Sequence, residues 1–163
     1  MSASYGVEIK NGDEVIKALQ LIAQKVTTGV TPAMRDVADH IAETSRLGFD
    51  EQQDPWGNPW KELAQSTKDR RRGTPPYQIL RDTSALINSI NGTAEGDTAR
   101  VGAGTGPSRD YARIHLFGGR AGRGRSTRIP ARPYLPVTEN GVELPREMED
   151  DLLKILYDHL EDG

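Results

Sequence analysis

Histidine is the first residue type to test for chemistry, because imidazole serves both metal binding and general acid–base catalysis. The chain has three histidines, at positions 40, 115 and 159, and no cysteine. No two histidines stand at a spacing such as HxxxH that would direct both rings to one metal ion. His115 lies among apolar residues, which favours a histidine of the core or of an interface. The sequence therefore predicts no metal site, and cysteine chemistry is absent.

A glycine-rich run and several carboxylate pairs are the remaining candidates for a catalytic or phosphate-binding site. The run Val101–Pro107, VGAGTGP, lacks the lysine of a Walker loop, and its proline removes one amide donor. The carboxylates at 50–51 and 149–151 stand in hydrophilic stretches, whereas acid–base catalysis requires a desolvated pair. No GxSxG nucleophile motif is present. We therefore expect no catalytic residue, no cofactor and no enzymatic activity.

Arginine is concentrated between residues 109 and 132, where seven arginines stand against one acid. The centre of this region, residues 118–129, reads GGRAGRGRSTRI. Three interpretations are open: a nucleic-acid-binding segment that follows phosphates, a solvated disordered loop, or a segment that becomes ordered against an acidic neighbour. Residues 139–163 supply such acids, nine of them against two basic residues. An identical subunit is therefore one possible neighbour.

The two tryptophans, Trp56 and Trp60, both stand in the turn-rich stretch DPWGNPW. Large aromatic side chains in a loop either fasten that loop to the core or anchor an interface. Attachment of the loop to the core is the favoured interpretation, and an interface anchor is the alternative. The candidate contact residues for a subunit or partner are Trp56, Trp60, Arg113, Arg120, Arg123, Arg125, Arg128 and Arg132.

The elements that must position these residues follow from hydrophobic periodicity. Apolar residues at three- and four-residue spacing predict helices at 13–26 and 31–49, which form an N-terminal helical hairpin. The same reasoning predicts shorter helices at 64–72, 83–90 and 111–118, and a C-terminal helix opened by Pro145. A β-hairpin is expected at 91–102 with its turn at 95–97, together with strands at 5–10 and 127–135. The prolines confine the last strand to a sheet edge.

The expected fold is therefore α+β in a single domain spanning 1–163. It combines the N-terminal helical hairpin, a small antiparallel β-sheet with an extended Gly/Arg-rich loop that is flexible over about 118–129, and the C-terminal helix. The chain has 163 residues, a formal net charge of −3 and 35% hydrophobic residues, so the core is modest and partners are expected to stabilise it. No signal pattern and no membrane-spanning run is present, so we expect a cytoplasmic product with no membrane contact.

The sequence resembles the phage virion morphogenesis family, the tail completion proteins of Mu-like and P2-like phages. The resemblance rests on four segments in the family's order: DPWGNPWKELAQSTKDRR, ILRDTSALINSI, VGAGTGPSRDYARIHLFGG and IPARPYL. They run from residue 54 to residue 135, about half of the chain. Leu116 stands where the family pattern leads us to expect glutamine.

The resemblance implies a structural virion protein, assembled in the host cytoplasm, that completes the tail or neck and joins the tail to the head connector. Such a subunit would form a ring with itself, a hexamer or a dodecamer. It would contact connector or adaptor, tail terminator or tail tube proteins, and DNA in the channel lumen is a further possible contact. The type-1 neck proteins share a similar layout, so the neck layer stays open. The alternative is a nucleic-acid-binding module that uses the Arg-rich loop 118–132.

Overall fold

The computed structural model describes residues 14–19 and 30–161. Residues 14–19 are helical and lie within the first predicted helix, with Val15 and Ala18 buried. The remainder of that helix, its turn to the next helix and the predicted strand at 5–10 lie outside the described residues. The described part has the predicted α+β composition, with two long helices, short helical turns and three two-stranded antiparallel sheets.

The helix α2 (Thr31–Glu51) is the central element of the structure. It carries Pro32 in its first turn, where the missing N–H costs nothing, and extends two residues beyond the predicted end. Its buried side chains follow the predicted three- and four-residue spacing, and they are Ala33, Met34, Val37, Ala38, Ile41, Ala42, Ser45 and Phe49. The amphipathic pattern of this segment therefore gave the correct helix and the correct buried face.

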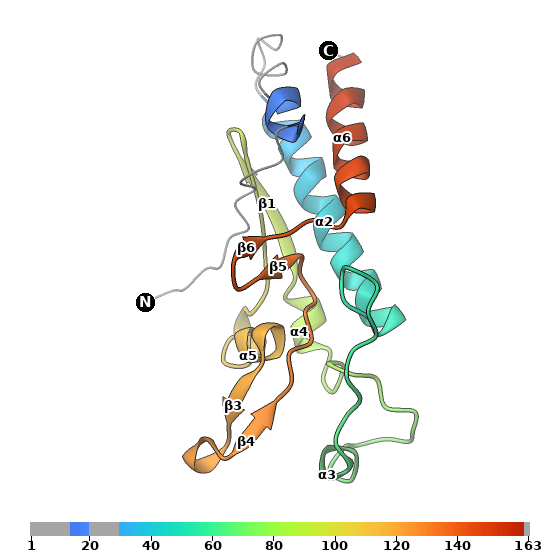
Figure 1. Ribbon diagram of the computed structural model, residues 1–163, viewed down its shortest axis with the longest axis vertical. Coiled ribbons are helices and arrows are strands. Elements are labelled where there is room, and N and C mark those ends of the chain that lie inside the picture. The colour runs from blue at the N-terminus through green and yellow to red at the C-terminus, as the bar shows by residue number, and fades with distance from the viewer. Residues whose placement is uncertain (1–13, 20–29, 162–163) are drawn as a thin grey trace.

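A β-hairpin lies along α2 (Figure 1). It consists of β1 (Asn91–Glu95) and β2 (Thr98–Gly102), which confirms the predicted hairpin. Its turn lies at 96–97, because Glu95 pairs with Thr98 and belongs to β1. A β-carbon on Gly92 would lie 2.7 Å from the backbone oxygen of Ala38 in α2. Only glycine therefore allows β1 to approach the helix backbone this closely.

The C-terminal helix α6 (Arg146–Glu161) packs against α2, and Figure 1 shows the two helices side by side. Pro145 precedes its first turn, as predicted, and the buried contacts are made by Met148, Leu152 and Leu156. A small hairpin of β5 (Val137–Thr138) and β6 (Gly141–Val142), absent from the prediction, leads into this helix.

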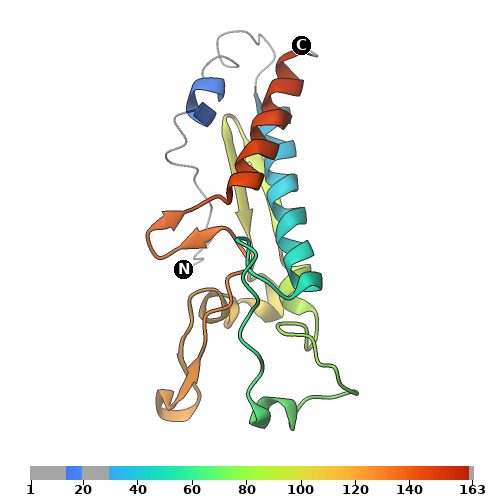
Figure 2. The ribbon, with the colours of Figure 1, turned by 45° about the vertical axis from the view of Figure 1, so that its right-hand side comes forward.

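The other end of the molecule holds short elements joined by long connections (Figure 2). These elements are α3 (Gln65–Lys68), α4 (Ala85–Asn88), the 3-10 turn η1 (Gly106–Ser108), α5 (Ala112–Phe117), β3 (Gly119–Ala121), the 3-10 turn η2 (Arg123–Arg125) and β4 (Thr127–Ile129). The helix expected at 64–72 is one turn long, so that prediction was too long. None of the α3 side chains is buried, and a helix without a buried face gains little from extension.

The Gly/Arg-rich segment differs from the extended loop that we expected. Residues 119–129 form a short antiparallel hairpin, in which β3 pairs with β4 and Arg120 lies opposite Arg128. The strand expected at 127–135 ends at Ile129, because Pro130 has no N–H to continue the ladder. No helix in the described parts of the chain is long and apolar enough to span a membrane.

Candidate functional site

The β3–β4 hairpin brings together four of the arginines predicted as contact residues. Arg120, Arg123, Arg125 and Arg128 are all exposed, and none forms an ion pair with any residue that the structure describes. The register places Arg120 directly opposite Arg128, and like charges in that relation destabilise a two-stranded ladder. The hairpin therefore concentrates positive charge at a local cost that an anionic partner would offset.

Arg132 does not join this exposed set, although it belongs to the same arginine-rich region. Its side chain is 5% exposed, and its guanidinium donates hydrogen bonds to the backbone oxygens of Lys61, at 2.8 Å, and Glu62, at 3.0 Å. The pKa of Arg132 is lowered by burial and by the nearby charge of Arg71. Arg132 fastens the segment after residue 60 to the segment after the hairpin.

Trp60 makes the second fastening between the same two segments. It is 5% exposed, and its indole N–H donates to the backbone oxygen of Pro133 at 2.7 Å. Its ring packs edge-on against Phe49 with centroids 5.1 Å apart, and the ring centroids of Phe49 and Tyr134 lie 5.7 Å apart. Trp60 in the described fold therefore supports the core, as the favoured interpretation of the tryptophans held.

The other two predicted contact residues occupy different surroundings. Trp56 is half-buried in the turn after α2, and its buried indole N–H has no hydrogen-bond acceptor among the described residues. Arg113 is exposed on α5, with its guanidinium 6.0 Å from the centre of the Phe117 ring. The structure thus separates the eight residues into the exposed hairpin set, the buried pair Trp60 and Arg132, and two positions, Trp56 and Arg113, that belong to neither group.

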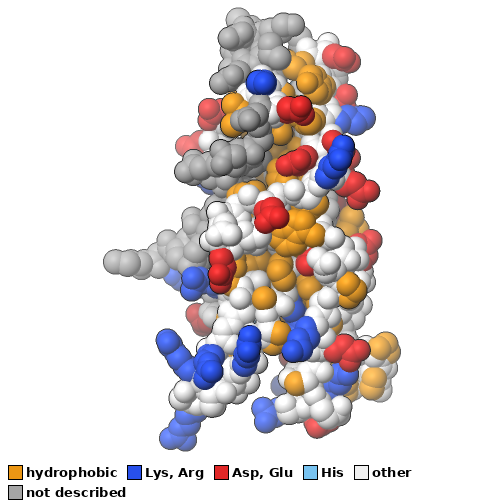
Figure 3. All heavy atoms as spheres, viewed as in Figure 1, with side chains coloured by type: hydrophobic (Ala, Val, Ile, Leu, Met, Phe, Trp, Pro, Cys, Tyr) orange, Lys and Arg blue, Asp and Glu red, His pale blue; other side chains and the backbone are white. Residues whose placement is uncertain are grey.

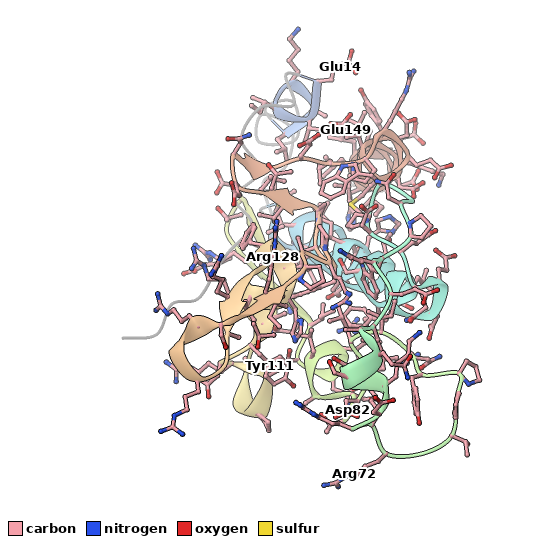
Figure 4. The ribbon with its side chains drawn as sticks, turned by 60° about the horizontal axis from the view of Figure 1, so that its bottom comes forward. Glu14, Arg72, Asp82, Tyr111, Arg128 and Glu149 are labelled. Atoms are coloured by element: carbon pink, nitrogen blue, oxygen red, sulfur yellow. The ribbon has the colours of Figure 1, made fainter. Side chains whose placement is uncertain are left out.

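A cleft of about 980 Å³ separates the hairpin from the segment 61–83. One side is formed by 127–132 and the other by 61–71 with 80–86, and Tyr111 and His115 complete the lining. Figure 3 shows Lys and Arg side chains gathered over this end of the molecule. Figure 4 labels Arg128 on the hairpin, Asp82 on the segment before α4, and Tyr111, all three of which line the cleft.

The charge of this cleft is positive, because its two carboxylates already have partners. Glu62 pairs with Lys68 at 3.1 Å, and Asp82 lies 3.8 Å from the guanidinium of Arg71. The remaining charged side chains in the lining that make no ion pair with any described carboxylate are Lys61, Arg70, Arg128 and Arg132. The cleft can therefore attract an anionic group by simple charge complementarity.

His115, which lines the cleft, is also affected by the positive charges around it. Its pKa is lowered from the ordinary value of 6.5, first by burial and then by the positive charges of Arg132 and Arg71. Its Nδ1 atom is buried and has no hydrogen-bond partner among the described residues. The ring of Tyr111 packs edge-on against it at 5.6 Å. Burial and these two positive charges thus disfavour the protonated form of His115.

We expect the stability of the protein to fall as the pH drops below 6.5. Because the pKa of His115 is lower in the folded state than in the unfolded state, the unfolded chain binds more protons in this window. The free energy of unfolding should therefore decrease as the pH is lowered from 6.5, until the pH falls below the pKa of His115 in the folded state. Urea unfolding at several pH values measures this, and His115→Gln should flatten the profile. An unchanged slope in that variant would contradict the assignment.

Sequence reasoning missed the second side of the cleft. Lys61, Arg70 and Arg71 stand about fifty to sixty residues before the hairpin, and the run KDRRR at 68–72 was the only local signal. In the described residues no group of three or more His, Asp and Glu side chains is arranged to hold a metal ion.

Comparison with known proteins adds a family relationship to this geometry. The sequence model of the phage virion morphogenesis family matches residues 10–160 of the chain. The chain is similar to Mu-like prophage FluMu G protein 2 of Haemophilus influenzae, with 36% identity over 156 residues that cover 95% of each protein. No solved structure matches the chain. The matched region includes the hairpin, the cleft and both long helices, and the chain therefore belongs to the phage virion morphogenesis family.

Proposed function

We propose that the protein is a structural subunit that forms a ring with copies of itself, completes the tail or neck of a tailed phage virion, and joins the tail to the head connector. Family membership and the prophage relative support a role in virion assembly. The observation that carries the ring is the separation of charge between two different surfaces. The hairpin end is basic, and the exposed side of α6 carries carboxylates.

Two different complementary surfaces on one chain suit a heterologous contact, in which one face of a subunit meets another face of the next. Such a contact generates a closed ring when the rotation between neighbours closes. The hairpin arginines Arg120, Arg123 and Arg125 then face a further acidic surface of a connector, terminator or tube protein, or the DNA in the channel. Their exposed charges favour a partner that supplies negative groups.

Native mass spectrometry together with electron microscopy of the purified protein tests this function. We expect ring-shaped particles of six or twelve subunits, with a mass that is a multiple of the 17.9 kDa chain. Since exposed charges contribute to the contact, a rise in salt concentration should shift the population toward smaller species. A strict monomer at every concentration, combined with tight binding to DNA, would overturn the proposal.

A nucleic-acid-binding module remains the second candidate, because the hairpin exposes four arginines and no acid. In that case the isolated protein should bind duplex DNA with an affinity that falls steeply as salt rises. The variant Arg123→Ala with Arg125→Ala should reduce both the affinity and the slope of its salt dependence. If this variant still forms rings but no longer binds DNA, Arg123 and Arg125 contact DNA and are not needed for the contact between subunits.

A further inference from the structure

We propose that the basic cleft between the β3–β4 hairpin and the segment 61–83 receives the exposed side of α6 from a second copy of this chain. This inference rests on the proposed ring and specifies which surfaces make its repeated contact. The cleft supplies the acceptor side, and α6 supplies the inserted side.

The cleft offers both charge and apolar surface. Lys61 and Arg70 on one side, and Arg128 on the other, have no ion-pair partner among the described residues. The same lining contains partly exposed apolar side chains, and they are Leu63, Tyr111, Ile129 and Pro130. The cleft therefore fits an aromatic or aliphatic side chain flanked by carboxylates.

The exposed side of α6 has that composition. Glu147, Asp150, Tyr157 and Glu161 follow one stripe of the helix, because their separations of three, seven and four residues return to the same face. All four are exposed, and the acids at 147, 150 and 161 make no ion pair with any described residue. Lys154, within the stripe, is already bound to Asp158 at 2.9 Å.

Tyr157 is the residue of this stripe that most needs a partner. It is 51% exposed, and Leu47 is the other large hydrophobic residue in the described parts of the chain with a comparable exposure, 50%. Tyrosine is favoured at the centre of interfaces, where its ring fills an apolar pocket and its hydroxyl keeps a polar contact. The apolar lining of the cleft provides such a pocket for the neighbour's Tyr157.

The space in the cleft suits the side chains of one helix face rather than a whole helix. The cleft has a volume of about 980 Å³. Within one molecule the buried side of α6 rests on α2 through Met148, Leu152 and Leu156, so its exposed stripe is available to a neighbour.

Charge reversal on each side separately, followed by mixing, tests the contact. The cleft variant carries Lys61→Glu, Arg70→Glu and Arg128→Glu, and the helix variant carries Glu147→Lys, Asp150→Lys and Glu161→Lys. All six positions are exposed, so both variants should keep the thermal midpoint of the unaltered protein within a few degrees. Each variant alone should self-associate about a hundredfold more weakly, because like charges then face one another.

An equal mixture of the two variants should reassemble. The unaltered α6 of one variant fits the unaltered cleft of the other, and the reversed surfaces also complement each other. Native mass spectrometry should show rings with equal numbers of the two chains. A matched control, Arg120→Glu with Arg123→Glu and Arg125→Glu, changes the charge equally on hairpin residues outside the cleft lining and should retain the ring.

The outcomes separate this inference from the function on which it rests. If the unaltered protein forms rings and both charge-reversed variants form them equally well, the cleft contact is wrong and the ring stands. If the mixture remains dissociated, the pairing of these two surfaces is wrong. If the unaltered protein forms no ring, the proposed function fails. The contact would still be supported if calorimetry showed that the two variants bind each other more strongly than either binds itself.

Discussion

Trp60→Ala is expected to lower the free energy of unfolding by about 3 to 5 kcal/mol, which is the usual cost of removing a buried large aromatic side chain. The indole is 5% exposed and packs edge-on against Phe49. Its removal leaves a cavity beside α2 and deprives the backbone oxygen of Pro133 of its donor. Guanidinium unfolding followed by far-UV circular dichroism measures the change, and the midpoint of thermal unfolding should fall by roughly 10 °C.

Trp56→Ala is the matched control, because it removes the same side chain four residues earlier. Trp56 is only half-buried and its indole N–H donates to no described residue, so less packing and no hydrogen bond is lost. We expect about 1 to 2 kcal/mol. If Trp60→Ala left the stability of the monomer unchanged and weakened self-association instead, Trp60 would be an interface anchor and the assignment to the core would be wrong.

The long helices and the β1–β2 hairpin could be predicted because their signals are local. In α2 the apolar residues from Ala33 to Phe49 recur at helical spacing, and the helix buries that same stripe. The turn between β1 and β2 follows from Gly96 and Asp97, which suit the tight reversal seen there. Pro145 likewise marks the start of α6. Each of these predictions needs only neighbouring residues.

The cleft could not be predicted, because it depends on contacts between residues far apart in the chain. Arg132 hydrogen bonds to backbone oxygens about seventy residues earlier, and no sequence pattern specifies that pairing. In the sequence it looks like one more arginine of a solvated arm. Its burial turns it from a candidate contact residue into an internal support, while Arg128, four residues earlier, stays exposed.

The hairpin within the Gly/Arg-rich segment was missed for a different reason. Its strands have three residues each, too short for an alternating pattern to stand out from a polar loop. The tip contains Gly122 and Gly124, both at positive φ, together with Arg125 at φ 52°. Glycine makes such a reversal accessible, but it favours a flexible loop equally well in the sequence. Local composition therefore could not decide between the two.

Arg132→Ala is expected to lower the free energy of unfolding by about 3 to 6 kcal/mol, since hydrogen bonds from a charged donor contribute roughly 1.5 to 3 kcal/mol each and two are lost. The backbone oxygens of Lys61 and Glu62 lose their donors, and the two segments beside the cleft are released from each other. Arg132→Lys should recover only part of the loss, because one ammonium cannot reproduce the planar two-point contact. Chemical unfolding of the three proteins at pH 7.5 measures this order.

Arg128→Ala is the control for charge, because it removes an equal charge from an exposed position beside the same cleft. Its effect on stability should stay within about 0.5 kcal/mol, while the proposed contact with α6 should weaken.

A second observable distinguishes Arg132 from a purely steric support. The charge of Arg132 lowers the pKa of His115, so Arg132→Met should raise that pKa in an NMR titration of the folded protein. If Arg132→Ala left the stability of the monomer unchanged and weakened self-association, the guanidinium would contact a neighbouring subunit. The assignment of Arg132 as an internal support would then be wrong.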